Sequence, residues 1–170
     1  MSISRQTLAK YLKSGDVFVE TGTRWGLTVL KALEIGVKVV HTIEVDPAMA
    51  DTARRIIVDA YPQDAWKVHL YTGDSTCVLK SLICELNEPA IFFLDAHDAS
   101  SPLPGELSVI VYHKAHAQDT ILIDDVRIIK SGQWGFTLEK VLELLKQINP
   151  NYKISYEDGV VPEDILVARS

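Results

Sequence analysis

The sequence predicts an α/β fold in which helices cover both faces of a mostly parallel, seven-stranded sheet. Short apolar runs alternate with helical patterns five times along the 170 residues. Most of these runs are nearly continuous in apolar residues, which is typical of parallel strands that are buried on both faces. Two last strands flank a turn at Asp158-Gly159 and predict a C-terminal antiparallel hairpin.

The expected strands are short apolar or β-branched runs bounded by glycine, proline or charged residues. The first reads VFVE and stops at a glycine turn, whereas IFFL and TILI are apolar throughout. In chain order the expected strands are 17–20, 37–45, 68–71, 91–94, 120–123, 152–156 and 165–168.

Helices are expected where apolar residues recur every three or four positions. Asp46-Pro47 predicts a helix start, because aspartate caps helix N-termini and proline fits the first turn. Gly36 predicts a helix end. The expected helices are 4–14, 28–35, 47–60, 75–86, 107–117 and 138–148, the last with a clear apolar stripe.

Composition narrows the class of protein. A hydrophobic fraction of 47% is ample for one domain over residues 1–170, and the net charge of −6 argues against nucleic acid as a partner. No apolar run approaches the length of a membrane helix, and the first residues lack a signal-peptide core. We therefore expect a cytoplasmic, single-domain protein. Cys77 and Cys84 are expected to be two buried thiols on one helix face.

Two acidic strand ends predict a nucleoside-type cofactor site. After the first strand, Gly22 permits a tight turn, Gly26 lets a helix begin close by, and N–H groups at that helix start can hold an anionic group. Glu44 ends the second strand, where a carboxylate can accept hydrogen bonds from ribose hydroxyls. The alternatives are a generic strand-to-helix turn and a surface acid. Asp46 is assigned to helix capping.

Further polar residues follow the next strands. Asp74 and Ser75 either meet a purine edge or cap the following helix. Asp95 follows the fourth strand, and Asp124-Asp125 follow the fifth. Adjacent strands would bring these three carboxylates together, and oxygen donors of this kind bind Mg²⁺. The alternative is that one aspartate caps a turn and the other pairs with Arg127.

Taken together, these motifs resemble those of class I S-adenosylmethionine-dependent methyltransferases. The segments that carry the resemblance are VFVETGTRWG, TIEVDP, YTGDS, FFLDAH and ILIDDV, in this order and spacing. The closest likeness is to divalent-metal-dependent O-methyltransferases of the catechol and macrocin types. The resemblance covers roughly residues 15–170 and implies a Rossmann-like, doubly wound sheet, S-adenosylmethionine as cofactor, Mg²⁺ or a similar ion, and a small-molecule acceptor.

The resemblance also implies roles for particular residues. The metal ligands would be Asp95, Asp124 and Asp125, and the metal would lower the pKa of the acceptor hydroxyl before it attacks the sulfonium methyl in line. The residues that match cofactor-binding positions are Glu20, Gly22, Thr23, Gly26, Thr28, Glu44, Gly73, Asp74, Ser75 and Asp95.

The sequence departs from the family pattern in two ways. Asp98 stands where catechol-type enzymes have a lysine base, so His97 or Asp98 would have to take the proton. Only one short helix precedes the first strand, so cover for the substrate must come from 100–105, from 127–136 with its Trp134, or from a second subunit in a homodimer. Trp134 is either a mobile substrate wall or an anchor for the last helix.

Several functions remain open at this point. The first is a metal-assisted O-methyltransferase whose acidic mouth suits a neutral polyol, sugar or phenol better than a phosphate-rich substrate. The second is a metal-independent methyltransferase with His97 as base, and the third is a protein that binds the cofactor without catalysis. A dinucleotide oxidoreductase is disfavoured, because the third glycine of its motif is missing. His113 and His116 are expected on a solvated helix face rather than as a metal pair.

Overall fold

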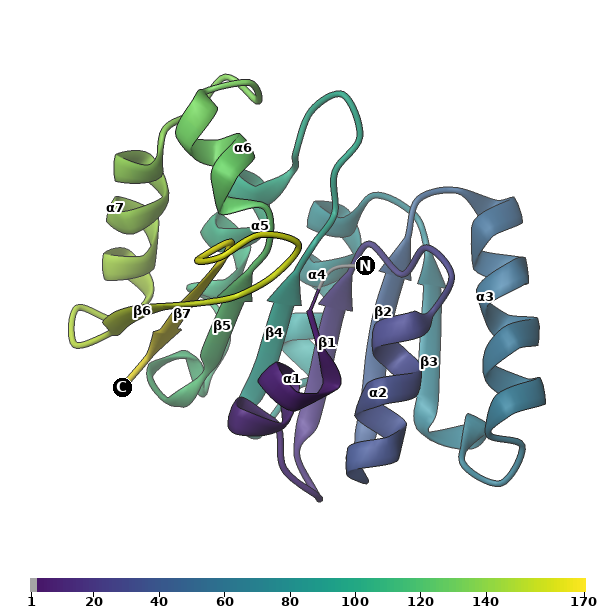
Figure 1. The fold of residues 1–170 in the computed structure, drawn as a ribbon. Helices are drawn as coiled ribbons and strands as arrows, with labels where there is room; N and C mark the ends of the chain where they lie inside the picture. Colours follow the sequence, from purple (N-terminus) through teal and green to yellow (C-terminus); the bar gives the residue numbers. More distant parts are fainter. Residues whose placement is uncertain (1–2) are drawn as a thin grey trace.

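The computed structural model describes residues 3–170 and folds them into a seven-stranded sheet with the order β3-β2-β1-β4-β5-β7-β6 (Figure 1). The strands are β1 (Val17–Thr21), β2 (Val39–Glu44), β3 (Val68–Thr72), β4 (Ala90–Leu94), β5 (Thr120–Ile123), β6 (Lys153–Glu157) and β7 (Ile165–Arg169). The first five are parallel, and β7 runs antiparallel to both β5 and β6. The predicted fold class and C-terminal hairpin are confirmed.

The strand order reverses between β1 and β4. β1 pairs with β2 on one side and with β4 on the other, so that Thr21 lies opposite both Ile43 and Leu94. β5 continues the sheet beyond β4, with Ile123 opposite Leu94. The carboxyl ends of β2, β1, β4 and β5 therefore meet at one edge, and ligands of open α/β sheets bind at such a reversal.

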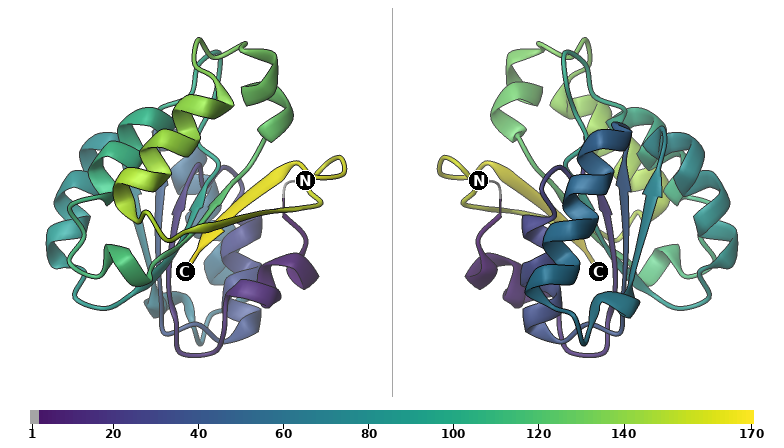
Figure 2. Two further views of the ribbon diagram at one scale, coloured as in Figure 1. Left: turned by 90° about the vertical axis from the view of Figure 1, so that its left-hand side faces the viewer. Right: turned by 90° about the vertical axis from the view of Figure 1, so that its right-hand side faces the viewer.

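Helices cover both faces of the sheet (Figure 2). One apolar core lies between the sheet and α1 and α2, with Ile57 of α3, and the other lies under α4, α5, α6 and α7. The helices are α1 (Arg5–Tyr11), α2 (Leu27–Ile35), α3 (Pro47–Ala60), α4 (Ser75–Glu85), α5 (Leu103–Ile110), α6 (Val126–Ser131) and α7 (Leu138–Ile148). β1 and β4 are buried along their whole length, which explains the apolar residues 17–19 of β1 and the continuous apolar sequence of β4.

Helix termini follow the capping residues. Ser4, Asp46 and Thr137 each accept a hydrogen bond from a backbone N–H in the first turn of α1, α3 and α7. Gly36 ends α2 with a left-handed backbone, as the sequence predicts. These local interactions fix where each helix leaves the sheet edge.

The region between β4 and β5 differs from the sequence-based expectation. Instead of a helix over 107–117, α5 begins earlier, after Pro102, and ends at Ile110. The chain then turns, so that His113 is fully buried with Nδ1 2.6 Å from Oδ2 of Asp119. His116 follows in a short 3₁₀ helix, and its Nδ1 lies 2.7 Å from the carbonyl oxygen of His113. The expectation of a solvated helix face is therefore wrong, because the turn buries His113 against Phe92 of β4.

Two further expectations are corrected. Cys77 and Cys84 are both exposed, because α4 buries Leu79, Leu82 and Ile83 instead. The short helix α6 was not expected from the sequence, because its apolar residues fall within a single turn and a half and leave little periodicity to detect.

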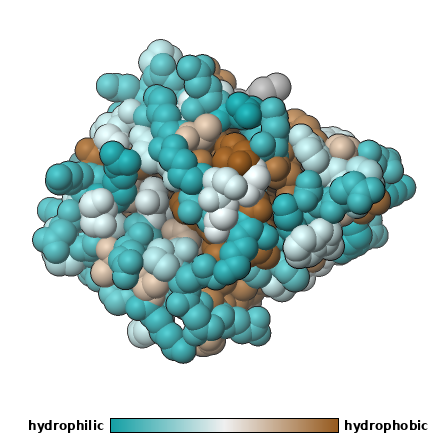
Figure 3. All heavy atoms as spheres, turned by 90° about the horizontal axis from the view of Figure 1, so that it is seen from below, coloured by the Kyte–Doolittle hydropathy of each residue, from teal (hydrophilic) through white to brown (hydrophobic). Residues whose placement is uncertain are grey.

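Figure 3 views the molecule from the amino-terminal ends of the parallel strands, where hydrophilic side chains surround smaller hydrophobic areas. Within residues 3–170, no helix combines the length and the apolarity needed to cross a bilayer. The loop after β4 and the segment after α6 project above the opposite edge (Figures 1 and 2).

Candidate cofactor and acceptor site

Gly22 joins β1 to the first turn of the candidate site. Its φ is +84°, and an added Cβ would lie 2.5 Å from the carbonyl oxygen of Asp95. Its N–H donates to the carbonyl oxygen of Ile43, 2.9 Å away. Only glycine fits at this position, because both the backbone angle and the close approach exclude a side chain. The turn therefore ties together the ends of β1, β2 and β4.

Glu20 lies beneath this turn, fully buried. The hydroxyl of Thr42 donates to Oε2 of Glu20 over 2.7 Å, and the Thr23 and Thr42 hydroxyl oxygens are 2.5 Å apart. Burial raises the pKa of Glu20 to about 8, although the hydroxyls of Thr42 and Thr28 oppose the rise. The hydroxyl groups of Thr23, Thr28 and Thr42 are thus placed around the Glu20 carboxyl group.

Glu44 ends β2 at the same edge and is 8% exposed. Its Oε2 accepts from the backbone N–H of Arg24 at 2.7 Å, and its Oε1 accepts from that of Asp46 at 3.0 Å. A carboxylate has about four acceptor positions, so these two bonds orient the group and leave capacity for ligand hydroxyls. Arg24 has a φ of +50°, and the hydrogen bond from its N–H to Glu44 stabilises this strained backbone conformation.

The third strand end caps its helix. Oδ1 of Asp74 accepts from the N–H of Cys77 over 3.0 Å, and Ser75 is the buried first residue of α4. The capping alternative therefore applies to Asp74. The loop at Gly73 lies beside the carboxyl end of β2, and the N–H of Gly73 donates to the carbonyl oxygen of Glu44 over 2.9 Å.

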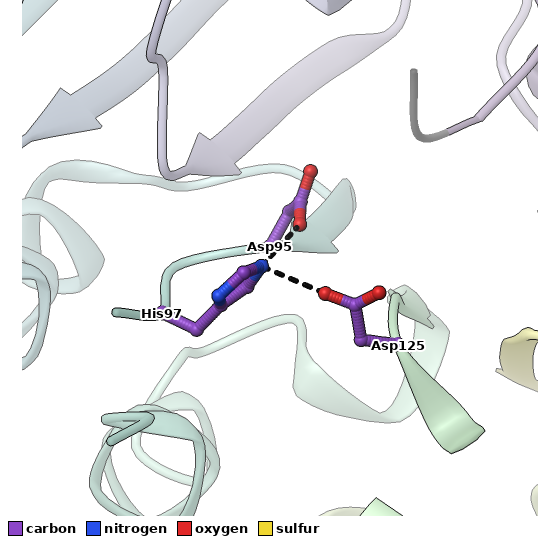
Figure 4. A group of neighbouring side chains, drawn as sticks. All are labelled: Asp95, His97 and Asp125. Atoms are coloured by element: carbon purple, nitrogen blue, oxygen red, sulfur yellow. Dashed lines mark ion pairs between the residues drawn. The ribbon is translucent and has the colours of Figure 1, made fainter. Parts of the chain in front are cut away.

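Asp95, His97 and Asp125 form the polar centre of the site (Figure 4). Nε2 of His97 lies 2.7 Å from Oδ2 of Asp125 and 3.8 Å from Oδ1 of Asp95. The hydrogen bond with Asp125 raises the pKa of His97, against the opposing effect of burial. Although burial disfavours its charge, Asp125 has a lowered pKa because His97 and Arg127 both bond to it. The pair is therefore a histidine oriented by a buried carboxylate.

The sequence-predicted aspartates fall into two overlapping sets. Asp95 groups with His97 and Asp125, whereas Asp124 groups with Asp125 and Asp164, each set having its ligand atoms within 4.8 Å. Asp125 turns away from the strand direction because its backbone is left-handed, with a φ of +59°. Oδ1 of Asp124 accepts from the N–H of Asp125 at 2.8 Å. Asp95, Asp124 and Asp125 thus do not form a single set of three.

The donor chemistry of Asp95, His97 and Asp125 is compatible with a divalent cation, since carboxylate and imidazole groups both bind such ions. Both oxygens of Asp125, however, already have side-chain partners. Oδ1 lies 2.7 Å from Nη2 of Arg127, and Oδ2 contacts His97. Arg127 also bonds to the buried Asp164 through Nη1 and its backbone N–H. A metal ion at Asp125 would have to displace the imidazole and tolerate the guanidinium.

Trp134 packs against the polar centre, and Phe136 packs against Trp134. The Trp134 ring lies 5.2 Å from the His97 ring and 6.2 Å from that of Phe136, measured between centroids. Trp134 therefore belongs to the site as well as to the segment before α7. Both candidate bases, His97 and Asp98, are exposed residues.

No family model matches the sequence, and no curated protein matches it. Solved structures match its fold. An O-methyltransferase of Streptomyces achromogenes, TomG, solved with S-adenosylmethionine, is 13% identical over 97% of this chain and 76% of its own, with a TM-score of 0.67. A Bacillus cereus O-methyltransferase with S-adenosylhomocysteine is 17% identical over 98% of this chain and 78% of its own, with a TM-score of 0.66.

A third neighbour is a precorrin-6y C5,15-methyltransferase of Geobacter metallireducens, 14% identical over 98% of this chain and 88% of its own, with a TM-score of 0.71. This chain has the class I methyltransferase fold. At such identities the likeness lies in the fold, so the chemistry has to be argued from the side chains of this chain.

Several residues of this methyltransferase fold escaped the sequence reasoning. Lys31 on α2 is half-buried, and its pKa is lowered by burial while Glu20, Asp124 and Asp95 oppose that change. Its amino group donates to the carbonyl oxygen of Ile3. The sequence signal for Lys31 was its position three residues after Thr28, which places both side chains on one face of α2. From the sequence, Arg127 was expected only as an alternative partner of an aspartate. Asp164, to which Arg127 bonds, lies in the hairpin turn, 37 residues after Arg127.

Proposed function

We propose that the protein is an S-adenosylmethionine-dependent methyltransferase that methylates a hydroxyl group of a small molecule, with His97 as the base. The observation that carries this proposal is the convergence of Glu20, Glu44 and the His97–Asp125 pair on one edge, at the reversal of strand order. The matched O-methyltransferase structures with S-adenosylmethionine or S-adenosylhomocysteine support it.

The charges of the site favour this cofactor over a dinucleotide. Glu44 and Asp95 lie at or next to the carboxyl ends of β2 and β4. S-adenosylmethionine carries an ammonium and a sulfonium cation, which carboxylates attract, whereas a dinucleotide pyrophosphate would be repelled. Glu44 supplies acceptors for the ribose hydroxyls, and the backbone around Gly22 leaves room for the ligand to approach closely.

His97 is oriented to accept a proton. Its Nε2–H donates to Asp125, which fixes the tautomer and leaves Nδ1 to accept the proton of the acceptor hydroxyl. The resulting oxygen nucleophile forms a bond to the methyl carbon while the S–CH₃ bond breaks, and the sulfonium becomes a neutral thioether. Asp125 stabilises the imidazolium that forms, as a carboxylate does in other histidine–carboxylate pairs.

A metal-assisted reaction is the second candidate, and the proximity of the Asp95, His97 and Asp125 ligand atoms favours it. Those residues would hold Mg²⁺ or a similar ion, which when bound lowers the pKa of a coordinated hydroxyl. Under this alternative His97 is a ligand and not a base. A chelator therefore separates the two candidates.

Cofactor binding is the first test. Isothermal titration calorimetry with S-adenosylhomocysteine should give a measurable affinity for the unmodified protein and at least tenfold weaker binding for Glu44→Gln. Glu88→Gln is the matched control, because Glu88 is exposed and pairs with Lys38 at the surface. Unchanged affinity in Glu44→Gln contradicts the ribose assignment, and absence of binding to the unmodified protein contradicts the proposed function.

Methyl transfer to a panel of phenols, sugars and polyols is the second test, measured with and without EDTA. Activity that survives EDTA and falls at least a hundredfold in His97→Gln supports His97 as base. Activity that EDTA abolishes and Mg²⁺ restores supports the metal-assisted alternative. Cofactor binding without transfer to any acceptor would identify a binding protein and refute catalysis.

A further inference from the structure

β6 is an edge strand with an exposed apolar surface. It is the last strand in the sheet order, and among residues 3–170 it pairs with β7 alone (Figure 1). Four of its five residues are exposed, and they include Ile154 and Tyr156. Val160 and Val161, in the turn that follows, are 56% and 40% exposed. Apolar side chains along an open strand edge favour pairing with another strand.

The opposite edge of the sheet has a different surface. β3 exposes His69 and Thr72, which are polar, while its other residues are partly buried. β6 also pairs with β7 in continuous register along its whole length, without a bulge or a proline. Edge strands that stay unpaired are usually protected by such devices. β6 is therefore the edge that is better suited to accept a further strand.

The charges of β6 are poorly matched within one copy of the chain. Lys153 lies directly opposite Arg169 of β7, and like charges in that position destabilise a strand pair. At the other end of β6, Glu157 accepts from Nζ of Lys10 at 2.5 Å and from the hydroxyl of Tyr11 at 2.6 Å. A carboxylate has about four acceptor positions, so Glu157 can accept from a further ammonium group. The strand thus offers a cation at one end and an acceptor at the other.

An antiparallel second copy of β6 matches both ends. With a two-fold axis at Ser155, Lys153 of each copy lies opposite Glu157 of the other, and Ile154 lies opposite Tyr156. Opposite charges and aromatic–β-branched pairs at such positions stabilise strand pairing. A parallel copy in register would place lysine opposite lysine, and any other antiparallel register would separate Lys153 from Glu157. The sequence of β6 is therefore complementary to itself in one register.

We infer that two copies of this chain associate through β6 about a two-fold axis at Ser155, which joins their seven-stranded sheets into one continuous sheet. The contact consists of one short strand and its turn, so it is small, and the dissociation constant should be micromolar rather than nanomolar. β6 runs in the same direction as β5. Because the two copies of β6 are antiparallel, the candidate sites lie at opposite edges of the joined sheet. This dimer does not depend on the proposed function.

Sedimentation velocity of the full chain, from micromolar to submillimolar concentrations, should show a monomer–dimer equilibrium. Lys153→Glu places glutamate opposite Glu157 of the other copy and should raise the dissociation constant at least about tenfold. The same change replaces the repulsion from Arg169 by attraction, so the loss of the dimer is not a loss of folding. Lys80→Glu, at an exposed position of α4, is the matched control and should leave the dimer unchanged. A monomer at every concentration, or a dimer that tolerates Lys153→Glu, overturns the inference.

A mixture of two charge variants tests the register. Glu157→Lys places two lysines opposite each other and should also weaken self-association. In an equimolar mixture of Lys153→Glu and Glu157→Lys, both facing pairs are oppositely charged, so a heterodimer should form more tightly than either variant associates with itself. A mixture that stays monomeric overturns the inference. Glu157→Lys also removes the bonds from Lys10 and Tyr11, so circular dichroism checks its fold, and Lys153→Glu decides the question if that variant does not fold.

Discussion

Replacing Gly22 by alanine should disrupt the junction between the ends of β1 and β4. The new Cβ would lie 2.5 Å from the carbonyl oxygen of Asp95 and 2.8 Å from its carbonyl carbon. These are backbone atoms, which cannot rotate away as a flexible side chain would. Asp95 must therefore shift, and its shift displaces the loop that carries His97.

The expected loss in the free energy of unfolding of Gly22→Ala has two parts of different origin. Alanine at a φ of +84° costs about 1–2 kcal/mol in backbone strain. Forcing an atom into occupied space typically costs a further 1–3 kcal/mol or so. Gly15 offers a matched control, because its φ is +90° and an added Cβ would have nothing within 4 Å. Gly15→Ala should therefore lower the free energy of unfolding by the backbone strain alone.

Thermal and urea unfolding of the two variants would measure the difference. For a domain of this size, each kcal/mol shifts the midpoint by roughly 2–4 °C, so Gly22→Ala should melt several degrees below Gly15→Ala. Calorimetry should show lost S-adenosylhomocysteine binding in Gly22→Ala only. Equal destabilisation of the two variants would refute the claim that close packing against Asp95 requires glycine.

Three further predictions concern buried carboxyl groups. Because burial raises the pKa of Glu20 from 4.5 to about 8, the folded state keeps a proton that the unfolded state releases, so the free energy of unfolding should fall as pH rises from about 5 to 8 and then level off. Urea unfolding of Glu20→Gln at several pH values should not show that fall. A pH profile equal to that of the unmodified protein would contradict the raised pKa of Glu20. Glu44→Ala should leave two backbone N–H groups without their acceptor and lower the free energy of unfolding by about 1–3 kcal/mol, against no change for exposed Glu34→Ala. Asp119→Ala should lower the free energy of unfolding by about 3–5 kcal/mol in urea, because it leaves buried His113 and the N–H of Ala90 without their partner. A loss below about 1 kcal/mol would show that the His113–Asp119 pair is dispensable.

The parallel sheet was predictable because its signals are local and strong. VFVE, IFFL and TILI are short apolar runs, and the structure buries β1 and β4 completely. Helix starts at Asp46 and Thr137, and the end at Gly36, depend on residues within one turn. The region from α5 to β5 was harder, because the buried pairing of His113 with Asp119 is a tertiary interaction that residue periodicity does not reveal.

The candidate site was predictable in position and less so in its contacts. Residues after adjacent parallel strands must meet at one edge, which places Glu20, Glu44 and Asp95 together. The partners of Asp125 could not be foreseen in the same way. They depend on its left-handed backbone and on Arg127, which α6 positions between Asp125 and Asp164. A helix of six residues leaves too weak a pattern to predict such geometry.

The left-handed backbone of Asp125 also offers a way to sort relatives of this chain by descent. Glycine or asparagine would adopt that conformation with less strain, so a lineage released from selection for orienting His97 has no reason to keep an aspartate there. Under the proposed function, homologues that retain both the aspartate and the histidine are expected to transfer methyl groups, and homologues with glycine in place of Asp125 are expected not to.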